Sequence, residues 1–162
     1  MRSNPSQRAQ GARIFQPQVE DPYRRQRKSK DALVCAECDV VFHGGRWYWG
    51  RPPVGPVSVG LCPACERVRD RYPAGTITLS GLPARYHDEV FGMIRNLERR
   101  QVAEHPLERL IDFERRNGDI MITTTGPHLA RRISGALRRR FHDGIAIHYS
   151  DGERLVRVAW IG

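Results

Sequence analysis

The sequence predicts an α+β protein in which a small cysteine-bearing module precedes a larger domain. Two observations predict this class. Two Cys-x-x-Cys pairs enclose a short stretch rich in glycine, proline and tryptophan, which is typical of a small module held by a metal ion. After them, segments with strand and helix periodicity follow in the order β-α-β-β-α-β, with one extra C-terminal strand.

Length and charge set the first limits on function. The 162 residues suffice for one small module beside a domain of roughly 80 to 100 residues. The net charge of +9 favours polyanionic partners, of which nucleic acid is the most common; a basic protein without such a partner is the alternative. No apolar run reaches the ~20 residues of a membrane helix and no signal sequence is visible, so we expect a cytoplasmic protein without a membrane partner.

Residues 1–31 are expected to form a disordered basic tail. The segment has few apolar side chains, so it cannot bury enough surface to offset the entropy of ordering. A basic arm of this kind strengthens RNA binding without choosing a sequence, whereas a solvated leader would have no role. The candidate RNA-binding residues of the tail are Arg24, Arg25, Arg27, Lys28 and Lys30.

Residues 32–75, the cysteine module, are expected to form a four-cysteine ribbon with a hairpin between two tight turns. Gly44-Gly45 predicts a turn before a strand at 46–49, and 57–59 is the expected return strand. Strand alternation places Trp47 and Trp49 on one face, so we expect at least one of them to pack into the module or against the next domain, with Tyr48 as the exposed aromatic residue. A short basic helical turn follows the second cysteine pair and ends at Pro73.

The spacing of the cysteines, C-x2-C-x23-C-x2-C, predicts a closed metal site. Two intervening residues let both sulfurs of a pair reach one ion, and two such pairs complete the tetrahedral geometry of structural Zn²⁺. A rubredoxin-like iron centre uses similar spacing and is the alternative, whereas a redox pair would leave one Cys-x-x-Cys unexplained. We expect one structural zinc ion, with His43 as an ordinary loop or strand residue and with these ligands: Cys35, Cys38, Cys62 and Cys65.

Residues 76–162, the C-terminal unit, are expected to form a ferredoxin-like (split β-α-β) domain with both helices on one face of an antiparallel sheet. The expected strands are 76–79, 107–114, 119–125, 145–149 and 155–161, and the expected helices are 82–102 and 127–141. Asn117-Gly118 predicts a hairpin turn, and Gly126-Pro127 predicts a helix start. The buried face of the second helix comprises Leu129, Ile133, Ala136, Leu137 and Phe141.

This second helix is rich in arginine. It carries five arginines and no acidic residue, so no ion pair within the helix offsets them. Forked guanidinium donors suit phosphate contact, and the aromatic residues of the cysteine module suit base stacking; a solvated charged face is the alternative. The candidate RNA-binding residues outside the tail are Arg46, Trp47, Tyr48, Trp49, Arg51, Arg131, Arg132, Arg138, Arg139 and Arg140.

The sequence shows no constellation typical of a catalyst. It contains no glycine-rich phosphate loop and no nucleophile elbow, and its six histidines are dispersed. We therefore do not expect an enzyme or a small-molecule substrate.

At CAEC…CPAC and ITTTGPHLARRISGALRRRF, over residues 32–150, the chain resembles the NMD-three family of large-ribosomal-subunit adaptors. The resemblance implies zinc binding by the four cysteines and contact with large-subunit ribosomal RNA and protein. The chain stops where longer relatives continue and lacks their transport signals, so nuclear export is not expected. We expect a non-catalytic zinc-binding protein that binds RNA, with the ribosome or its large subunit as target; a zinc-dependent protein–protein adaptor is the alternative.

Overall fold

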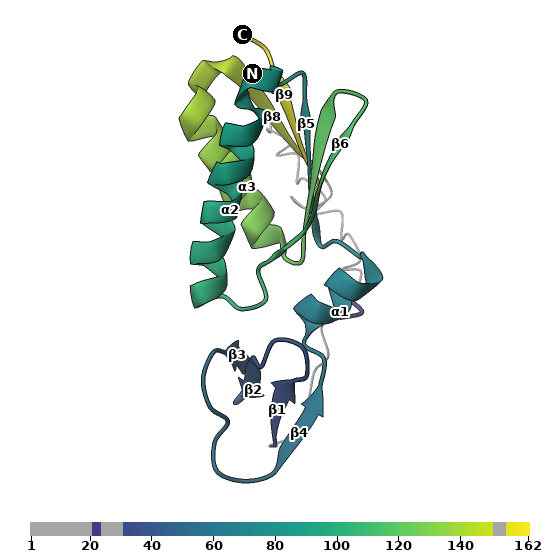
Figure 1. Cartoon of the computed structure of the whole chain (residues 1–162), viewed down its shortest axis with the longest axis vertical. Helices are drawn as coiled ribbons and strands as arrows, with labels where there is room; N and C mark the ends of the chain where they lie inside the picture. The colour runs from purple at the N-terminus through teal and green to yellow at the C-terminus, as the bar shows by residue number, and fades with distance from the viewer. Residues whose placement is uncertain (1–20, 24–30, 151–154) are drawn as a thin grey trace, which may run out of the picture.

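The computed structural model describes residues 21–23, 31–150 and 155–162. These residues form an α+β structure with two mixed sheets and three α-helices. Figure 1 shows one sheet toward each end of the long axis, with helix α1 (Pro63–Asp70) between them. Within the described ranges, no helix combines the length and the apolar character that a membrane crossing requires. The basic tail residues from Arg24 to Lys30 lie outside these ranges.

The cysteine module contains a four-stranded sheet in the order β3-β2-β1-β4. Its strands are β1 (Ala32–Cys35), β2 (Val41–His43), β3 (Arg46–Tyr48) and β4 (Val57–Gly60). Strand β2 pairs antiparallel with both β1 and β3, whereas β4 runs parallel to β1. The expected turn between β2 and β3 is confirmed, because Gly44 and Gly45 have φ angles of 59° and 82° there.

The hairpin expected within the module is wrong in its pairing. The tryptophan-bearing strand β3 pairs with β2, with Trp47 opposite Phe42, and not with β4. The two-glycine turn returns the chain at once from β2 to β3, whereas the longer loop 49–56 carries it across to the other edge of the sheet. Strands β1 and β2 were not predicted, because their apolar residues follow one another without the alternation that indicated a strand at 46–49.

Helix α1 contacts two residues of the N-terminal segment. Arg67 is 4% exposed, and its guanidinium carbon lies 4.5 Å from the ring centre of Tyr23. The same guanidinium donates to the carboxylate of Asp21, and the Tyr23 hydroxyl donates to Asp70 at 3.0 Å. These contacts order residues 21–23 within a segment that was expected to be disordered; the remainder of that segment, up to residue 30, lies outside the described residues.

The C-terminal unit is built on a five-stranded sheet in the order β6-β7-β5-β9-β8. Its strands are β5 (Gly75–Ser80), β6 (Leu110–Arg116), β7 (Asp119–Thr124), β8 (Ile145–Ser150) and β9 (Leu155–Trp160). All pairs are antiparallel except β5–β9, which is parallel. The expected hairpin turn joins β6 to β7, with φ angles of 53° at Asn117 and 87° at Gly118.

The ferredoxin-like arrangement is not confirmed. In that arrangement the first and last strands of the β-α-β-β-α-β series would be neighbours, but here the extra strand β9 lies between β5 and β8. Its buried Val156 and Val158 pair with Ile77 and Leu79 of β5 in the middle of the sheet. Burial of these valines favours a central place for β9, and the parallel pairing makes the sheet mixed rather than antiparallel.

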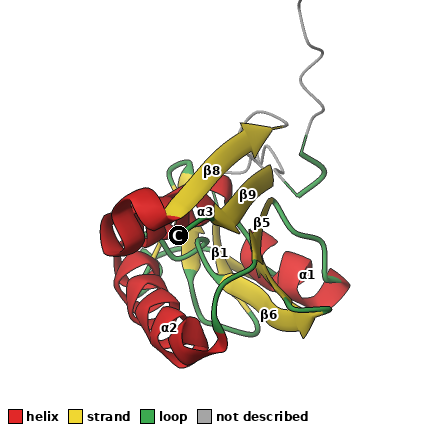
Figure 2. Ribbon diagram, turned by 90° about the horizontal axis from the view of Figure 1, so that it is seen from above, coloured by secondary structure: helices red, strands yellow, loops and turns green. Residues whose placement is uncertain are grey.

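Two helices cover one face of this sheet, as expected. They are α2 (His87–Glu104) and α3 (Pro127–Phe141), with short 3₁₀ turns at Ala84–Tyr86 and His142–Gly144. Figures 1 and 2 show both helices on the same side of the strands. The predicted apolar face of α3 is confirmed: Leu129, Ile133 and Leu137 are fully buried, in one core with Val90 and Ile94 of α2.

Candidate metal centre

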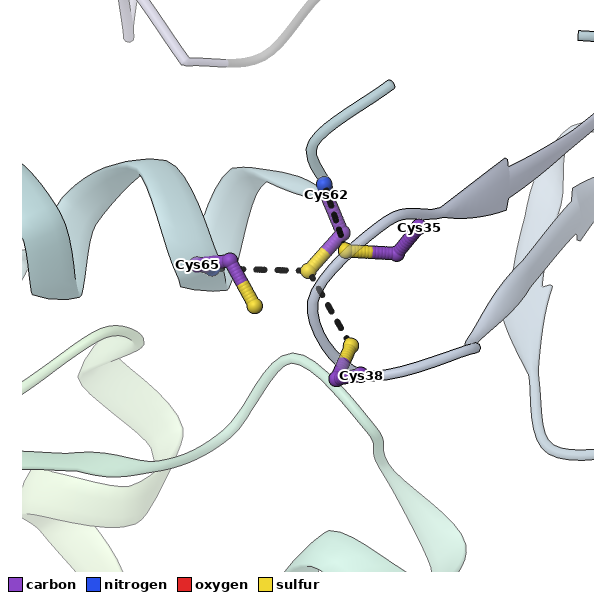
Figure 3. Close-up of side chains that lie close together, drawn as sticks. All are labelled: Cys35, Cys38, Cys62 and Cys65. Atoms are coloured by element: carbon purple, nitrogen blue, oxygen red, sulfur yellow. Dashed lines mark hydrogen bonds between the residues drawn. The ribbon is translucent and has the colours of Figure 1, made fainter. Parts of the chain in front are cut away.

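The four cysteines of the chain lie together. Cys35 ends β1 and Cys38 lies in the turn that follows, whereas Cys62 precedes α1 and Cys65 lies in its first turn. Their four Sγ atoms all lie within 4.8 Å of one another. Figure 3 shows the sulfurs of the turn and those of the helix start pointing toward a common centre.

A tight turn positions the first pair. The Asp39 N–H donates to the carbonyl of Cys35 at 3.0 Å, and the Cys35 N–H donates to the carbonyl of Val40 at 2.9 Å. Asp39 has a φ of 62°, in the left-handed region that aspartate tolerates better than most residues. The first Cys-x-x-Cys therefore forms the tight turn that its spacing predicts, which we call the knuckle.

A helix start, and not a second knuckle, positions the other pair. Cys62 is the N-cap of α1, and Pro63 occupies the first turn, where a missing N–H costs nothing. Because residues three apart in a helix lie on one face, Cys62 and Cys65 direct their sulfurs to the same side. The second of the two expected tight turns is therefore the start of a helix, which Pro63 could have indicated.

The distances fit a tetrahedral four-thiolate site. Cys38 Sγ and Cys62 Sγ are 3.8 Å apart, and metal–sulfur bonds of ~2.3 Å in a tetrahedron require sulfurs about 3.8 Å apart. All four cysteines are free of disulfides. The N–H of Cys62 donates to Cys35 Sγ at 3.2 Å, and that of Cys65 donates to Cys62 Sγ at 3.4 Å. Such donors stabilise thiolates, so the chain fits one metal ion in a closed site.

The surroundings of the thiols determine how readily each ionises. Burial raises the pKa of Cys35, but backbone hydrogen bonds, that of Cys62 first, outweigh it and lower this pKa to about 7. Burial raises the pKa of Cys62 to about 11 and also raises that of Cys65, with a further contribution from the charge of Cys62. Near neutral pH the latter two thiols are therefore protonated without metal, and metal binding must release their protons.

An arginine of the C-terminal unit reaches the site. Arg109, just before β6, donates from its guanidinium to Cys38 Sγ at 3.1 Å and to Cys65 Sγ at 3.4 Å. Burial lowers the pKa of Arg109, but the hydrogen bond to Cys38 outweighs it and the pKa is raised, so the side chain stays a cation. Sequence reasoning missed Arg109, because it lies 44 residues from Cys65 and no motif distinguishes it from other arginines.

The aromatic residues of the module follow the prediction only in part. Trp47 packs against the cysteine cluster together with Leu107 of the C-terminal unit. Trp49 is 41% exposed, yet its indole N–H donates to the carbonyl of Val102 in α2 at 2.7 Å. Tyr48 is partly buried, so the expectation that it is the exposed aromatic is wrong. Strand β3 ends at Tyr48, and alternation therefore does not extend to Trp49.

His43 is not among the clustered ligand atoms. It lies in β2, and its Nδ1 is buried without a hydrogen-bond partner among the described residues. The cluster that can hold a metal ion consists of the four cysteines alone. This placement agrees with the expectation that His43 is a strand residue rather than a ligand.

Three of the candidate RNA-binding residues line one cavity, and most of the others that the structure describes are exposed elsewhere. Arg46, Trp47 and Arg132 line one cavity of about 560 Å³ between the cysteine module and the ends of α2 and α3. Arg138 and Arg139 are exposed near the C-terminus of α3, and Arg51 and Arg131 are exposed as well. The Nη2 of Arg140 donates to Glu89 of α2 at 3.1 Å. Helix α3 contains no acidic residue that could pair with its arginines, whereas Arg140 pairs with the neighbouring helix.

Comparison with protein-family models, with curated proteins and with solved structures found no match to the chain. The site is therefore interpreted from its own geometry. Four converging sulfurs, backbone N–H donors and one arginine fit a structural metal ion whose coordination is complete.

We expect the purified protein to contain one equivalent of zinc per chain, measured by elemental analysis. The filled d shell of Zn²⁺ imposes no other coordination geometry, so four thiolates arranged in a tetrahedron suit this ion. An iron centre would instead give thiolate-to-iron absorption in the visible range. A protein that carried neither metal after purification under reducing conditions, and bound neither on titration, would contradict the assignment of the cysteine cluster as a metal site.

Proposed function

We propose that this chain is a non-catalytic zinc-binding protein that binds RNA, and that the RNA is ribosomal. One observation carries the proposal: arginines from both parts of the chain, Arg46 of β3 and Arg132 of α3, line the same cavity beside Trp47. A hollow that combines guanidinium groups with an aromatic ring suits single-stranded RNA, whose phosphates pair with arginine and whose bases stack. The ribosome as target follows from the resemblance to the NMD-three family alone.

The arginines that line the cavity support contact with phosphate groups. His105 and His128 line the cavity with the two arginines, and Glu104 and Glu108 provide the opposing charge. Glu108 is already engaged, because its Oε2 accepts the N–H of Leu129 in the first turn of α3. Its negative charge is thereby offset in part by the positive end of the helix.

Helix α3 extends the basic surface away from the cavity. Arg132 and Arg139 are seven residues apart, which corresponds to about 10 Å along a helix axis. Both are exposed, and neither has an acidic neighbour within the helix. This spacing lets one RNA strand contact the cavity and the end of α3 together. Arg140 contributes less, since its pair with Glu89 competes with phosphate.

We expect the double variant Arg46→Ser/Arg132→Ser to weaken RNA binding. Removal of two phosphate contacts should make the negative slope of log affinity against log salt shallower by about 1.4 for single-stranded RNA, since each contact contributes about −0.7. Filter binding of ribosomal RNA fragments at several salt concentrations measures this slope. The matched control is Arg116→Ser, at an exposed position that pairs with Glu114.

Two results would contradict the proposal. Wild-type protein that fails to bind ribosomal RNA at low salt, and does not sediment with ribosomal particles, would exclude the function. Equal salt slopes for the wild type and the double variant would exclude the cavity as the binding surface.

A protein–protein adaptor is the second candidate, and the edge strand β4 favours it. Val57 and Val59 of this strand are 43% and 73% exposed, and Val54 before it is fully exposed. An edge strand with exposed valines offers unpaired backbone groups to a partner strand. A complex that resists nuclease and is lost in Val59→Lys, with no RNA bound by the wild type, would favour this function.

A further inference from the structure

We propose that Arg109 couples metal binding in the cysteine module to the packing of the C-terminal unit against it. The guanidinium of Arg109 donates to one sulfur of each cysteine pair, Cys38 and Cys65. It therefore bridges the knuckle and the helix start, the two local structures that a metal ion joins. Arg109 acts as a positioning residue, because it contacts the ligands and not the ion.

The charge of the metal site gives the contact its strength. Zn²⁺ with four thiolates has a formal charge of −2, and Cys35, Cys62 and Cys65 are buried. A negative charge in such surroundings is costly unless a cation or hydrogen-bond donors are close to it. Among the described residues, the side-chain cation with hydrogen bonds to these sulfurs is Arg109.

Hydrogen bonds within the C-terminal unit fix both the backbone and the guanidinium of Arg109. Its Nε donates to the carbonyl of Pro106 at 2.8 Å, and its backbone N–H donates to Thr125 Oγ1 at 2.8 Å. The N–H of Thr125 returns a bond to the carbonyl of Arg109 at 2.9 Å, and its hydroxyl donates to the carbonyl of Leu107 at 2.6 Å. Thr125 is buried between β7 and α3, so this network ties the guanidinium to the start of α3.

A second contact lies beside the first. The ring of Trp49 is 5.7 Å from the Arg109 guanidinium carbon, and its indole N–H binds the carbonyl of Val102 near the end of α2. Loss of metal would remove the negative charge that Arg109 pairs with, and so weaken the contact between the module and the end of α2. Coupling between two equilibria is reciprocal, so loss of this contact must also weaken metal binding.

The test compares Arg109→Met and Arg109→Lys with the wild type and with the control Arg116→Met, which removes an exposed arginine from the same strand region. Zinc release to a chromophoric chelator and the thiolate-to-Co²⁺ absorption of the Co²⁺-substituted protein report on the site. Hydrogen exchange of peptides 99–104 and 105–110 reports on the contact between the units. Far-ultraviolet circular dichroism confirms that each variant is folded.

We expect Arg109→Met to release zinc about 10- to 100-fold faster, the range typical of residues that support metal ligands, and to shift the Co²⁺ absorption. Peptides 99–110 should exchange faster in this variant with metal bound, to the level that wild type reaches after chelation. Arg109→Lys should be intermediate, since one ammonium keeps the charge but cannot donate to both sulfurs as a fork does. Arg116→Met should match wild type.

The proposal is overturned if Arg109→Met matches wild type in both measurements. It is also overturned if only one measurement changes. Faster zinc release with unchanged hydrogen exchange would mean that Arg109 only supports the metal ligands. Faster exchange with unchanged zinc release would mean that Arg109 only contributes to the contact between the units. If Arg109→Met does not fold, Arg109→Lys decides by the same two measurements. None of these outcomes depends on RNA binding, which can fail or succeed separately.

Discussion

Replacement of Cys62 with serine is expected to abolish metal binding and to unfold the cysteine module. Cys62 Sγ is fully buried, lies 3.8 Å from Cys38 Sγ and accepts the N–H of Cys65. A serine oxygen can still cap α1, so the variant removes the thiolate ligand while keeping the helix signal. Structural zinc supplies ~10–16 kcal/mol of apparent folding free energy to small domains, more than this module can replace.

The buried cluster of the module is centred on the metal site. That cluster consists of Cys35, Val40, Cys62, Ala64 and Cys65, and three of these five residues are candidate metal ligands. The core of the C-terminal unit contains no residue of this cluster. We therefore expect amide NMR signals of residues 32–65 to collapse to the unfolded range, whereas those of the second sheet stay dispersed.

The matched control for this variant is Val59→Ser, which introduces the same residue at an exposed position of β4. It should keep one equivalent of zinc and a folded module. Retention of one equivalent of zinc by Cys62→Ser, with unchanged affinity, would show that three cysteines suffice and that the fourth ligand comes from elsewhere.

Local signals explain why parts of the fold could be predicted. Helix α3 spans 127–141 as expected, because Gly126-Pro127 marks its start and apolar residues recur on one face. Strand β7 and the Asn117-Gly118 turn were likewise indicated by short stretches of sequence. The convergence of the four cysteines was predictable for the same reason, since the spacing within each pair allows little else.

Pairings between distant segments could not be predicted in this way. The place of β9 between β5 and β8 depends on which strand buries its valines best, and this is a property of the assembled sheet. The parallel pairing of β4 with β1 depends on the path of the loop 49–56. Arg109 reaches the cysteines because Thr125 fixes its backbone and the carbonyl of Pro106 holds its guanidinium. None of these contacts has a local signature.

Replacement of Leu137 with alanine should strongly destabilise the C-terminal unit. Leu137 is fully buried in α3, in the core that joins α3 to the sheet. Truncation of a buried leucine removes its transfer free energy and leaves a cavity, with a typical cost of 2–5 kcal/mol. Urea unfolding followed by circular dichroism at 222 nm measures the loss. The control is Leu155→Ala, whose leucine is 39% exposed and should cost much less.

The same variant separates the stability of the C-terminal unit from that of the metal site. In buffer, where Leu137→Ala is still folded, zinc should be released as slowly as from wild type, because Leu137 does not contact the cysteine cluster. At urea concentrations that unfold the C-terminal unit, Arg109 is withdrawn from Cys38 and Cys65, and release should accelerate to the rate of Arg109→Met. Wild type at the same urea concentration, still folded, should release zinc slowly. Equal release rates from the folded and unfolded forms would mean that the cysteine module retains its metal without any contribution from the C-terminal unit.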